Sequence, residues 1–156
     1  MPKFVYKFET ILDLKEQIED NLKNELGKAY RKLEFEKDKL MSLENEKKEL
    51  VTELVSKTSD GIPAGKIREY GSYLGVVRER IWHQQESVNY AQCNVDKCKE
   101  RLIKAVQEKK MFEKLKEKQY RVYMKEQFRQ EQRLTDEIVS YNEARKTSPV
   151  STGGNQ

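Results

Sequence analysis

The stretch that decides the fold is residues 67–105, IREYGSYLGVVRERIWHQQESVNYAQCNVDKCKERLIKA. Counting forward from Ile67 by three and four residues in turn reaches an apolar residue at every step except Gln84. Such a repeat places the side chains along one line of an α-helix, which is the seam of a coiled coil. The seam positions are Ile67, Tyr70, Leu74, Val77, Ile81, Gln84, Val88, Ala91, Val95, Cys98, Leu102 and Ala105. We therefore expect a long helix that buries a narrow stripe.

Composition agrees with a thin, elongated structure. Of the 156 residues, 37% are charged and 36% are apolar, whereas globular domains average roughly 25% charged residues. The apolar material is too sparse for a thick core. The 31 basic and 27 acidic residues are interleaved and leave a formal charge of only +4. No polybasic block indicates nucleic acid, so we expect no nucleic-acid partner from charge alone.

A second helix is predicted upstream, over residues 6–57, which contain no Pro and a single Gly. Its first apolar positions step mostly by four, which predicts a nearly straight or slightly right-handed seam. Its later positions keep heptad spacing, with Glu36 and Lys47 at seam positions where they help to fix the register. The apolar positions are Ile11, Leu14, Ile18, Leu22, Leu26, Ala29, Leu33, Leu40, Leu43, Leu50 and Leu54.

The two helices are separated by turn chemistry at residues 56–65, SKTSDGIPAG. We expect an all-α fold, a long antiparallel two-helix coiled-coil hairpin that is monomeric. Its single domain would cover residues 1–146, with helices at 6–57 and 64–146 joined by a turn at 58–63. Residues 147–156 would form a disordered tail.

The arms of this hairpin are unequal. Folding back at Asp60 and Gly61 places Tyr6 near Leu115, so the rest of the second helix would have no partner within the chain. Residues 104–133 hold ten Lys and Arg against five Glu, interleaved with aromatic residues. This segment is a candidate docking surface for a protein with an acidic lining. A solvated helix face and a nucleic-acid contact remain open alternatives.

The sequence predicts no enzyme, no catalytic residue, no metal and no cofactor. His83 is the single histidine, and Cys93 and Cys98 are too far along the helix to join it in a site. Nucleotide-binding and metalloprotease motifs are absent from the sequence. No apolar run is long enough to span a membrane, and the first residues do not resemble a signal peptide.

Three residues of the second helix have two interpretations each. Trp82 either packs at the edge of the seam or forms an exposed contact for a partner. Gly71 and Gly75 either permit close approach of another backbone or allow bending near the turn. The periodicity alone does not decide between these interpretations.

Several short stretches together resemble the flagellar export protein FliJ family and its injectisome counterparts. They are Phe4, Tyr6 and Phe8, residues 11–16 (ILDLKE), Gly61 and Ile62, residues 70–74 (YGSYL), residues 107–110 (QEKK) with Leu115, and residues 132–137 (QRLTDE). The resemblance covers about residues 4–146. Thr135 separates Leu134 from Asp136, where the family more often has the Asp directly after the apolar residue.

The resemblance implies a cytoplasmic protein, peripheral at the inner face of the cell membrane, that works in type III export. It implies a stalk that inserts in the hexameric export ATPase, promotes its assembly and activity, and contacts the membrane export gate and export chaperones. Our candidates for the ATPase contact are Tyr6, Phe8, Phe112, Lys116, Arg121, Tyr123 and Lys125. Our candidates for the gate contact are Leu43, Leu50, Tyr73, Val77 and Arg80. The alternative function is a generic dimeric coiled-coil scaffold or adaptor.

Overall fold

The computed structural model describes residues 3–147, which form two helices, α1 (Glu9–Asp60) and α2 (Ala64–Thr147). The expected all-α, antiparallel two-helix fold is confirmed, and the described residues contain no strand. α1 begins three residues later than the expected helix 6–57 because residues 3–8 are not helical. The expected disordered tail, residues 147–156, lies outside the described residues except for Thr147, which ends α2.

The turn owes its shape to Gly61 and Pro63. Gly61 has φ 80°, the left-handed conformation that stops a helix at little cost only when the residue is glycine. Its amide donates to the Thr58 carbonyl at 3.3 Å. The Pro63 carbonyl accepts hydrogen bonds from the amides of Lys66 and Ile67, which starts α2 immediately after the turn.

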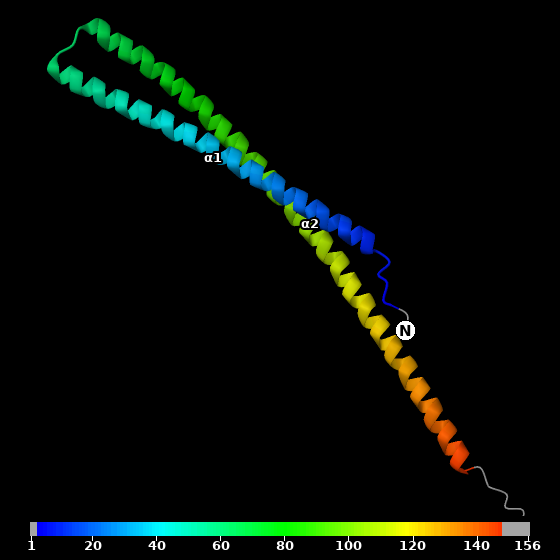
Figure 1. Cartoon of the computed structure of the whole chain (residues 1–156). Helices are drawn as coiled ribbons and strands as arrows, with labels where there is room; N and C mark the ends of the chain where they lie inside the picture. The colour runs from blue at the N-terminus through cyan, green and yellow to red at the C-terminus, as the bar shows by residue number, and fades with distance from the viewer. Residues whose placement is uncertain (1–2, 148–156) are drawn as a thin grey trace, which may run out of the picture. The chain divides into compact units, whose positions relative to one another are not determined.

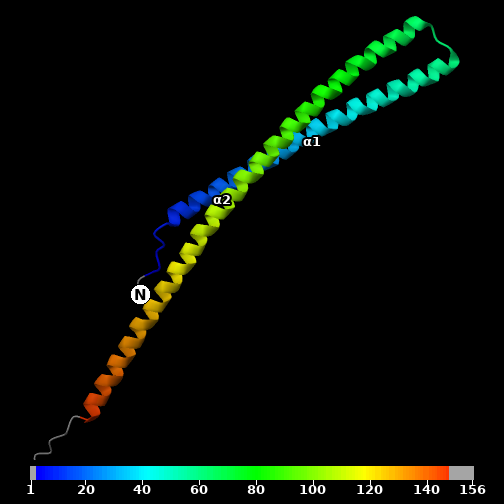
Figure 2. The same ribbon diagram turned by 180° about the vertical axis from the view of Figure 1, so that it is seen from behind.

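The described residues divide into two compact units. The first comprises residues 14–108, and the second comprises residues 3–13 together with 109–147 within the described chain. In the first unit, α1 and the green part of α2 run antiparallel on either side of the turn (Figures 1 and 2). In the second unit, the N-terminal segment lies along the continuation of α2.

The core of the first unit is thin and lies on the predicted seam. Leu33 of α1 is buried against Ala91 and Val95 of α2, and Leu26, Ala29 and Val88 pack around them. Val77 and Val95 are fully buried. Toward the turn the seam loosens, since Ile67 remains 41% exposed. The heptad seam of α2 is thus confirmed, with its best packing in the middle of the predicted stretch.

The seam of α1 differs from the prediction at its N-terminal end. Ile11 and Leu14 were expected inside, but they are 37% and 53% exposed, while Leu12 and Glu19 are buried. Counting from Leu12 by three and four residues reaches only buried or half-buried residues up to Leu54. α1 therefore keeps one heptad register throughout, and the predicted straight or right-handed seam is wrong. The positions are Leu12, Lys15, Glu19, Leu22, Leu26, Ala29, Leu33, Glu36, Leu40, Leu43, Lys47, Leu50 and Leu54.

Polar residues are tolerated at seam positions of this register because their side chains form hydrogen bonds and ion pairs there. The Gln84 side-chain amide donates to the Glu36 carbonyl oxygen at 2.9 Å and also to the Glu36 carboxylate. Lys32 Nζ lies 3.1 Å from the same carboxylate. Glu36 and Gln84, two of the three polar seam positions noted in the sequence, therefore meet each other. Shifting the helices past one another would separate this pair and leave both groups poorly satisfied, so the pair specifies the register.

Gly71 and Gly75 do not mediate close helix packing. A Cβ atom built on either residue would meet nothing within 4 Å. Both residues are exposed on α2, so the predicted close approach of a backbone within this chain is wrong. What remains is the cost of two glycines in a helix interior, which weakens α2 near the turn.

Candidate partner-binding surfaces

The N-terminal segment, residues 3–8, is held against α2 by Tyr6. The Tyr6 side chain is only 5% exposed, and its hydroxyl donates to the Phe112 carbonyl at 2.9 Å. A helix carbonyl has a second lone pair, so it can accept this bond without losing its own helical one. Two predicted candidates, Tyr6 and Phe112, are thus brought together, close to where the fold-back argument placed them.

Aromatic rings and one ion pair extend this contact along α2. Phe8 lies edge-on to Phe112, with ring centroids 6.3 Å apart, and Lys116 Nζ lies 2.9 Å from a Glu9 carboxylate oxygen. Phe4 contacts the rings of Tyr120 and Tyr123 at 5.2 and 5.4 Å. Offset and edge-to-face ring pairs of this kind favour docking beyond their buried area. Four of the seven ATPase-binding candidates therefore take part in internal packing: Tyr6, Phe8, Phe112 and Tyr123.

Sequence reasoning missed Phe4, Glu9 and Tyr120 as members of this contact. The Phe-x-Tyr-x-Phe alternation at residues 4–8 was the available signal, since alternate residues of an extended segment point the same way. The remaining candidates face solvent to different degrees. Arg121 and Lys125 are exposed, and Arg121 pairs with Glu117 one turn away at 2.6 Å. The side chain of Lys116 is 40% exposed.

Beyond Tyr123, α2 exposes an apolar face. Leu134, Ile138 and Tyr141 are 59%, 60% and 68% exposed. Their spacing of four and three residues puts them on one side of the helix. At ~100° per residue this is the same side that carries Phe112 and Tyr123, which the N-terminal segment covers. The face covered by residues 3–8 therefore continues, uncovered, to the end of the described helix.

The gate candidates lie near the turn of the first unit, but they are not equally accessible. Tyr73 is 42% exposed and its hydroxyl donates to the Glu46 carboxylate, which raises the pKa of the tyrosine. Arg80 is exposed, while Leu43 and Leu50 are half-buried. Val77 is fully buried. Of the five gate candidates, only Tyr73 and Arg80 are therefore exposed to a partner.

A polar cluster ties the helices together next to the turn. Lys57 Nζ donates to the Tyr70 hydroxyl at 2.6 Å and lies 3.0 Å from Glu53, and the Tyr70 hydroxyl donates to Glu53 at 3.1 Å. The hydrogen bond to Tyr70, and then the one to Glu53, raise the pKa of Lys57. The pKa of Glu53 is lowered, chiefly by its hydrogen bond to Lys57. Both shifts keep the groups charged, which suits a structural ion pair rather than a proton-transfer pair.

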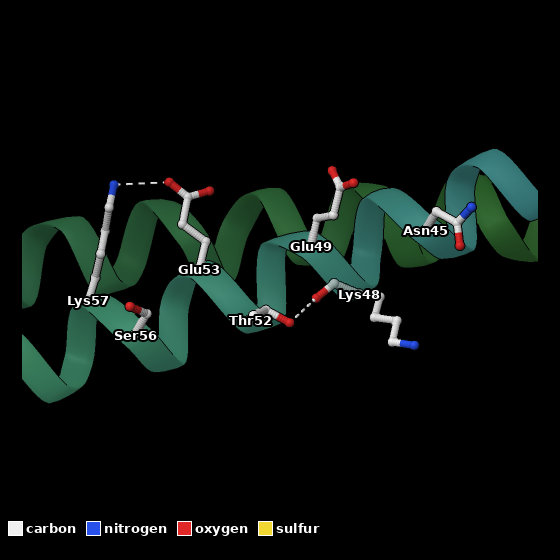
Figure 3. A pocket seen from close by; sticks show the side chains of 7 residues that line it. All are labelled: Asn45, Lys48, Glu49, Thr52, Glu53, Ser56 and Lys57. Atoms are coloured by element: carbon white, nitrogen blue, oxygen red, sulfur yellow. Dashed lines mark hydrogen bonds and ion pairs between the residues drawn. The ribbon is translucent and has the colours of Figure 1, made fainter.

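Figure 3 shows the groove beside this cluster. Its lining residues all belong to α1, so the groove is an open strip along one helix. Glu53 and Lys57 already pair there, and the Thr52 hydroxyl donates to the Lys48 carbonyl at 2.8 Å. Ligand sites usually enclose most of their ligand with residues from several elements. The lining residues are Asn45, Lys48, Glu49, Thr52, Glu53, Ser56 and Lys57.

The reactive side chains of α2 form no cluster within residues 3–147. His83 Nε2 lies 3.9 Å from Glu79, and no group of three potential metal ligands occurs in the described chain. Cys98 is half-buried at its expected seam position, and Cys93 is exposed. Trp82 is 56% exposed, so it does not pack at the seam edge as one of its two interpretations held. Neither described helix is apolar enough to cross a bilayer.

Comparisons with known proteins agree with this architecture. The family described as "Flagellar FliJ protein" matches residues 4–148. A protein of that description from Bacillus subtilis (strain 168) is 25% identical over 135 residues, covering 86% of this chain and 92% of the relative. The solved structure of CT670 from Chlamydia trachomatis, described as a YscO homologue, superposes with a TM-score of 0.67. It shares 23% identity and covers 94% of this chain and 100% of its own, a likeness that concerns the fold.

Proposed function

Since the chain belongs to the flagellar FliJ family, we propose that it is a non-enzymatic component of the flagellar type III protein export apparatus. In this proposal the chain is a coiled-coil stalk that inserts in the hexameric export ATPase and promotes its assembly and activity. It also links the ATPase to the membrane export gate and to export chaperones. The protein would work in the cytoplasm, peripheral to the membrane through its partners.

The observation that carries the proposal is the uncovered face of α2 beyond Tyr123. Leu134, Ile138 and Tyr141 continue the face that residues 3–8 cover, yet each is more than half exposed. A single helix with an exposed apolar line gains stability by packing on a partner. In a ring, this apolar line would pack against the subunits that surround the stalk.

Exposure refines which candidate residues would touch the ATPase. Arg121 and Lys125 face solvent and are the best placed for direct contact. Tyr6, Phe8, Phe112 and Tyr123 would act by holding the N-terminal segment on α2, and Lys116 by its ion pair with Glu9. For the export gate, Tyr73 and Arg80 would make contact, supported from beneath by Leu43, Leu50 and Val77.

The test is turnover of the cognate ATPase with added chain. Wild-type chain should raise turnover and ring formation. The double variant Arg121→Glu/Lys125→Glu should lose most of this effect. Its new carboxylates would face the acidic lining expected of the partner, and close like charges cost several kcal/mol at an interface. Lys28→Glu/Lys97→Glu changes net charge equally on exposed sites of the first unit and should stimulate like wild type. No stimulation by wild-type chain in micromolar excess would refute the proposal.

The alternative function is a generic dimeric scaffold or adaptor. The same exposed apolar face of α2 would support it if a second copy of the chain packed on that face. Light scattering separates the two functions. The stalk predicts one chain of 18.5 kDa in solution. A scaffold that dimerises through α2 predicts twice that mass at micromolar concentration.

A further inference from the structure

A continuous line of cations follows the outer side of α2 in the second unit. Its members recur every three or four residues, and all are exposed. At ~100° per residue they lie on the side of the helix facing away from Phe112 and Tyr123. We call this line the basic stripe, and it consists of Lys110, Lys114, Lys118, Arg121, Lys125 and Arg129. It spans about 28 Å along the helix axis.

Acidic residues hardly interrupt the stripe. Glu113 and Glu126 lie on other sides of α2, and Glu117 at the border pairs with Arg121 at 2.6 Å. An evenly spaced row without alternating sign does not stabilise a helix, because cations one turn apart repel each other. The repulsion within this row therefore destabilises the helix in the free chain, and binding to an anionic surface would reduce that repulsion.

Exposed apolar side chains flank the same stripe. Met111 and Val122 lie along one edge and Phe128 along the other, and they are 60%, 63% and 64% exposed. Clustered cations favour binding to an anionic membrane surface, and exposed apolar side chains beside them add shallow contact with the headgroup layer. A nucleic-acid duplex offers phosphates to the cations but no environment for the three apolar side chains.

We infer that the basic stripe is a docking surface for an anionic phospholipid bilayer. The helix would lie on the surface, with Lys and Arg at the headgroup phosphates and Met111, Val122 and Phe128 in shallow contact with the headgroup layer along the two edges of the stripe. The opposite side of the same helical segment stays occupied, because the N-terminal segment covers it through Tyr6 and Phe112. This contact is direct and goes beyond the partner-mediated membrane location proposed above.

The test is sedimentation of the full chain with vesicles of phosphatidylcholine, with or without about 30% phosphatidylglycerol. Each Lys or Arg near an anionic surface favours binding by roughly fivefold. Replacing Lys110, Lys114 and Lys118 by Gln should thus weaken binding to anionic vesicles at least tenfold. The matched variant Lys28→Gln/Lys37→Gln/Lys97→Gln loses the same charge from exposed sites of the first unit and should bind within twofold of wild type.

The apolar contribution has its own readout. Phe128→Trp in a Trp82→Phe background should shift its fluorescence emission to the blue with anionic vesicles and not with neutral ones. Equal binding by both triple variants, equal binding to neutral vesicles, or an unshifted emission from the Phe128→Trp chain would overturn the inference. Tight, salt-sensitive binding to duplex DNA without vesicle binding would assign the stripe to nucleic acid instead. None of these measurements involves the ATPase, and none changes Arg121 or Lys125, the two stripe residues that are also proposed to contact it. Their outcome is therefore independent of the proposed function.

Discussion

At the residue scale, the hydrogen-bonded pair of Glu36 and Gln84 specifies the register of α1 against α2. The hydrogen bond from Gln84, and then the one from Lys32, hold the pKa of Glu36 below its ordinary value of 4.5. A carboxyl group with a depressed pKa stabilises the folded state fully at a pH above its ordinary value. That stabilisation is lost as the pH falls through the depressed pKa.

Glu36→Gln should therefore reduce the acid sensitivity of the fold. Between neutral pH and about pH 3, wild-type chain should lose more unfolding free energy than the variant, because only the carboxylate is weakened by protonation. Urea unfolding followed by far-UV circular dichroism measures the difference. Glu34→Gln, an exposed neighbour on α1, is the control and should keep the wild-type pH profile. Identical profiles for all three proteins would contradict the role given to Glu36.

The glycines of α2 give a second prediction at this scale. Gly71→Ala and Gly75→Ala should each raise the free energy of unfolding by about 0.5–1 kcal/mol, because the sites are helical and have open space for a Cβ atom. Gly61→Ala should instead lower it by about 1–2 kcal/mol, since Gly61 has φ 80°. Destabilisation by either α2 substitution would show that the backbone there is not as described.

At the element scale, the seam of α2 carries much of the packing energy. Val77→Ala should cost about 1.5–3 kcal/mol, because Val77 is fully buried. Val76→Ala removes the same atoms from a side chain that is 43% exposed and should cost well under 1 kcal/mol. Chemical denaturation of both variants measures the contrast. Similar costs would mean that α2 is rotated relative to the predicted seam.

The N-terminal segment is the other element whose docking can be tested. Tyr6→Phe removes the hydrogen bond to the Phe112 carbonyl and should weaken docking of the segment by about 0.5–1.5 kcal/mol. Amide hydrogen exchange of residues 3–13 should then rise severalfold, while exchange in residues 14–108 stays unchanged. Tyr141→Phe, at a side chain that is 68% exposed, is the control. Unchanged exchange in Tyr6→Phe would contradict the anchoring role.

How well each element could be predicted depended on how its polar residues are placed. α2 was predictable because only Gln84 interrupts its heptads. The seam of α1 was predicted incorrectly at its N-terminal end. Two polar residues, Lys15 and Glu19, occupy seam positions there, whereas the apolar residues Ile11 and Leu14 lie on the exposed surface. Lys15 is compatible with the seam because it pairs with Glu108 at 2.7 Å, a contact that periodicity within one helix does not reveal.

The candidate site was predictable only where it followed from the fold-back geometry. The position of the turn placed Tyr6 near Leu115, and Tyr6 does bond to Phe112 nearby. The contacts of Phe4 with Tyr120 and Tyr123 depend on a non-helical segment whose path no repeat specifies. Tyr6 and Val77 are buried only because another part of the chain covers them. The sequence alone therefore did not show which candidate residues are exposed to a partner and which are buried beneath them.

At the scale of the whole molecule, the two units have different roles. Residues 14–108 form a coiled coil whose register is specified by paired polar side chains. The second unit carries both the uncovered apolar face and the basic stripe, which lie on different sides of one helix. Arg121 and Lys125 of the stripe are shared by the contacts proposed for the ATPase and for the membrane, so one chain cannot use these two side chains for both partners at once. Binding to partners is the role that this arrangement supports.

A stalk within an ATPase ring occupies the single central position of the ring, so the stoichiometry of the complex shows whether this chain is such a stalk. Light scattering of the isolated complex with the cognate export ATPase gives the number of chains bound. One chain for each hexameric ring is the expected result, and the Arg121→Glu/Lys125→Glu variant should be absent from the complex. One chain on every ATPase subunit, or rings that form equally well and stay free of the chain, would contradict it.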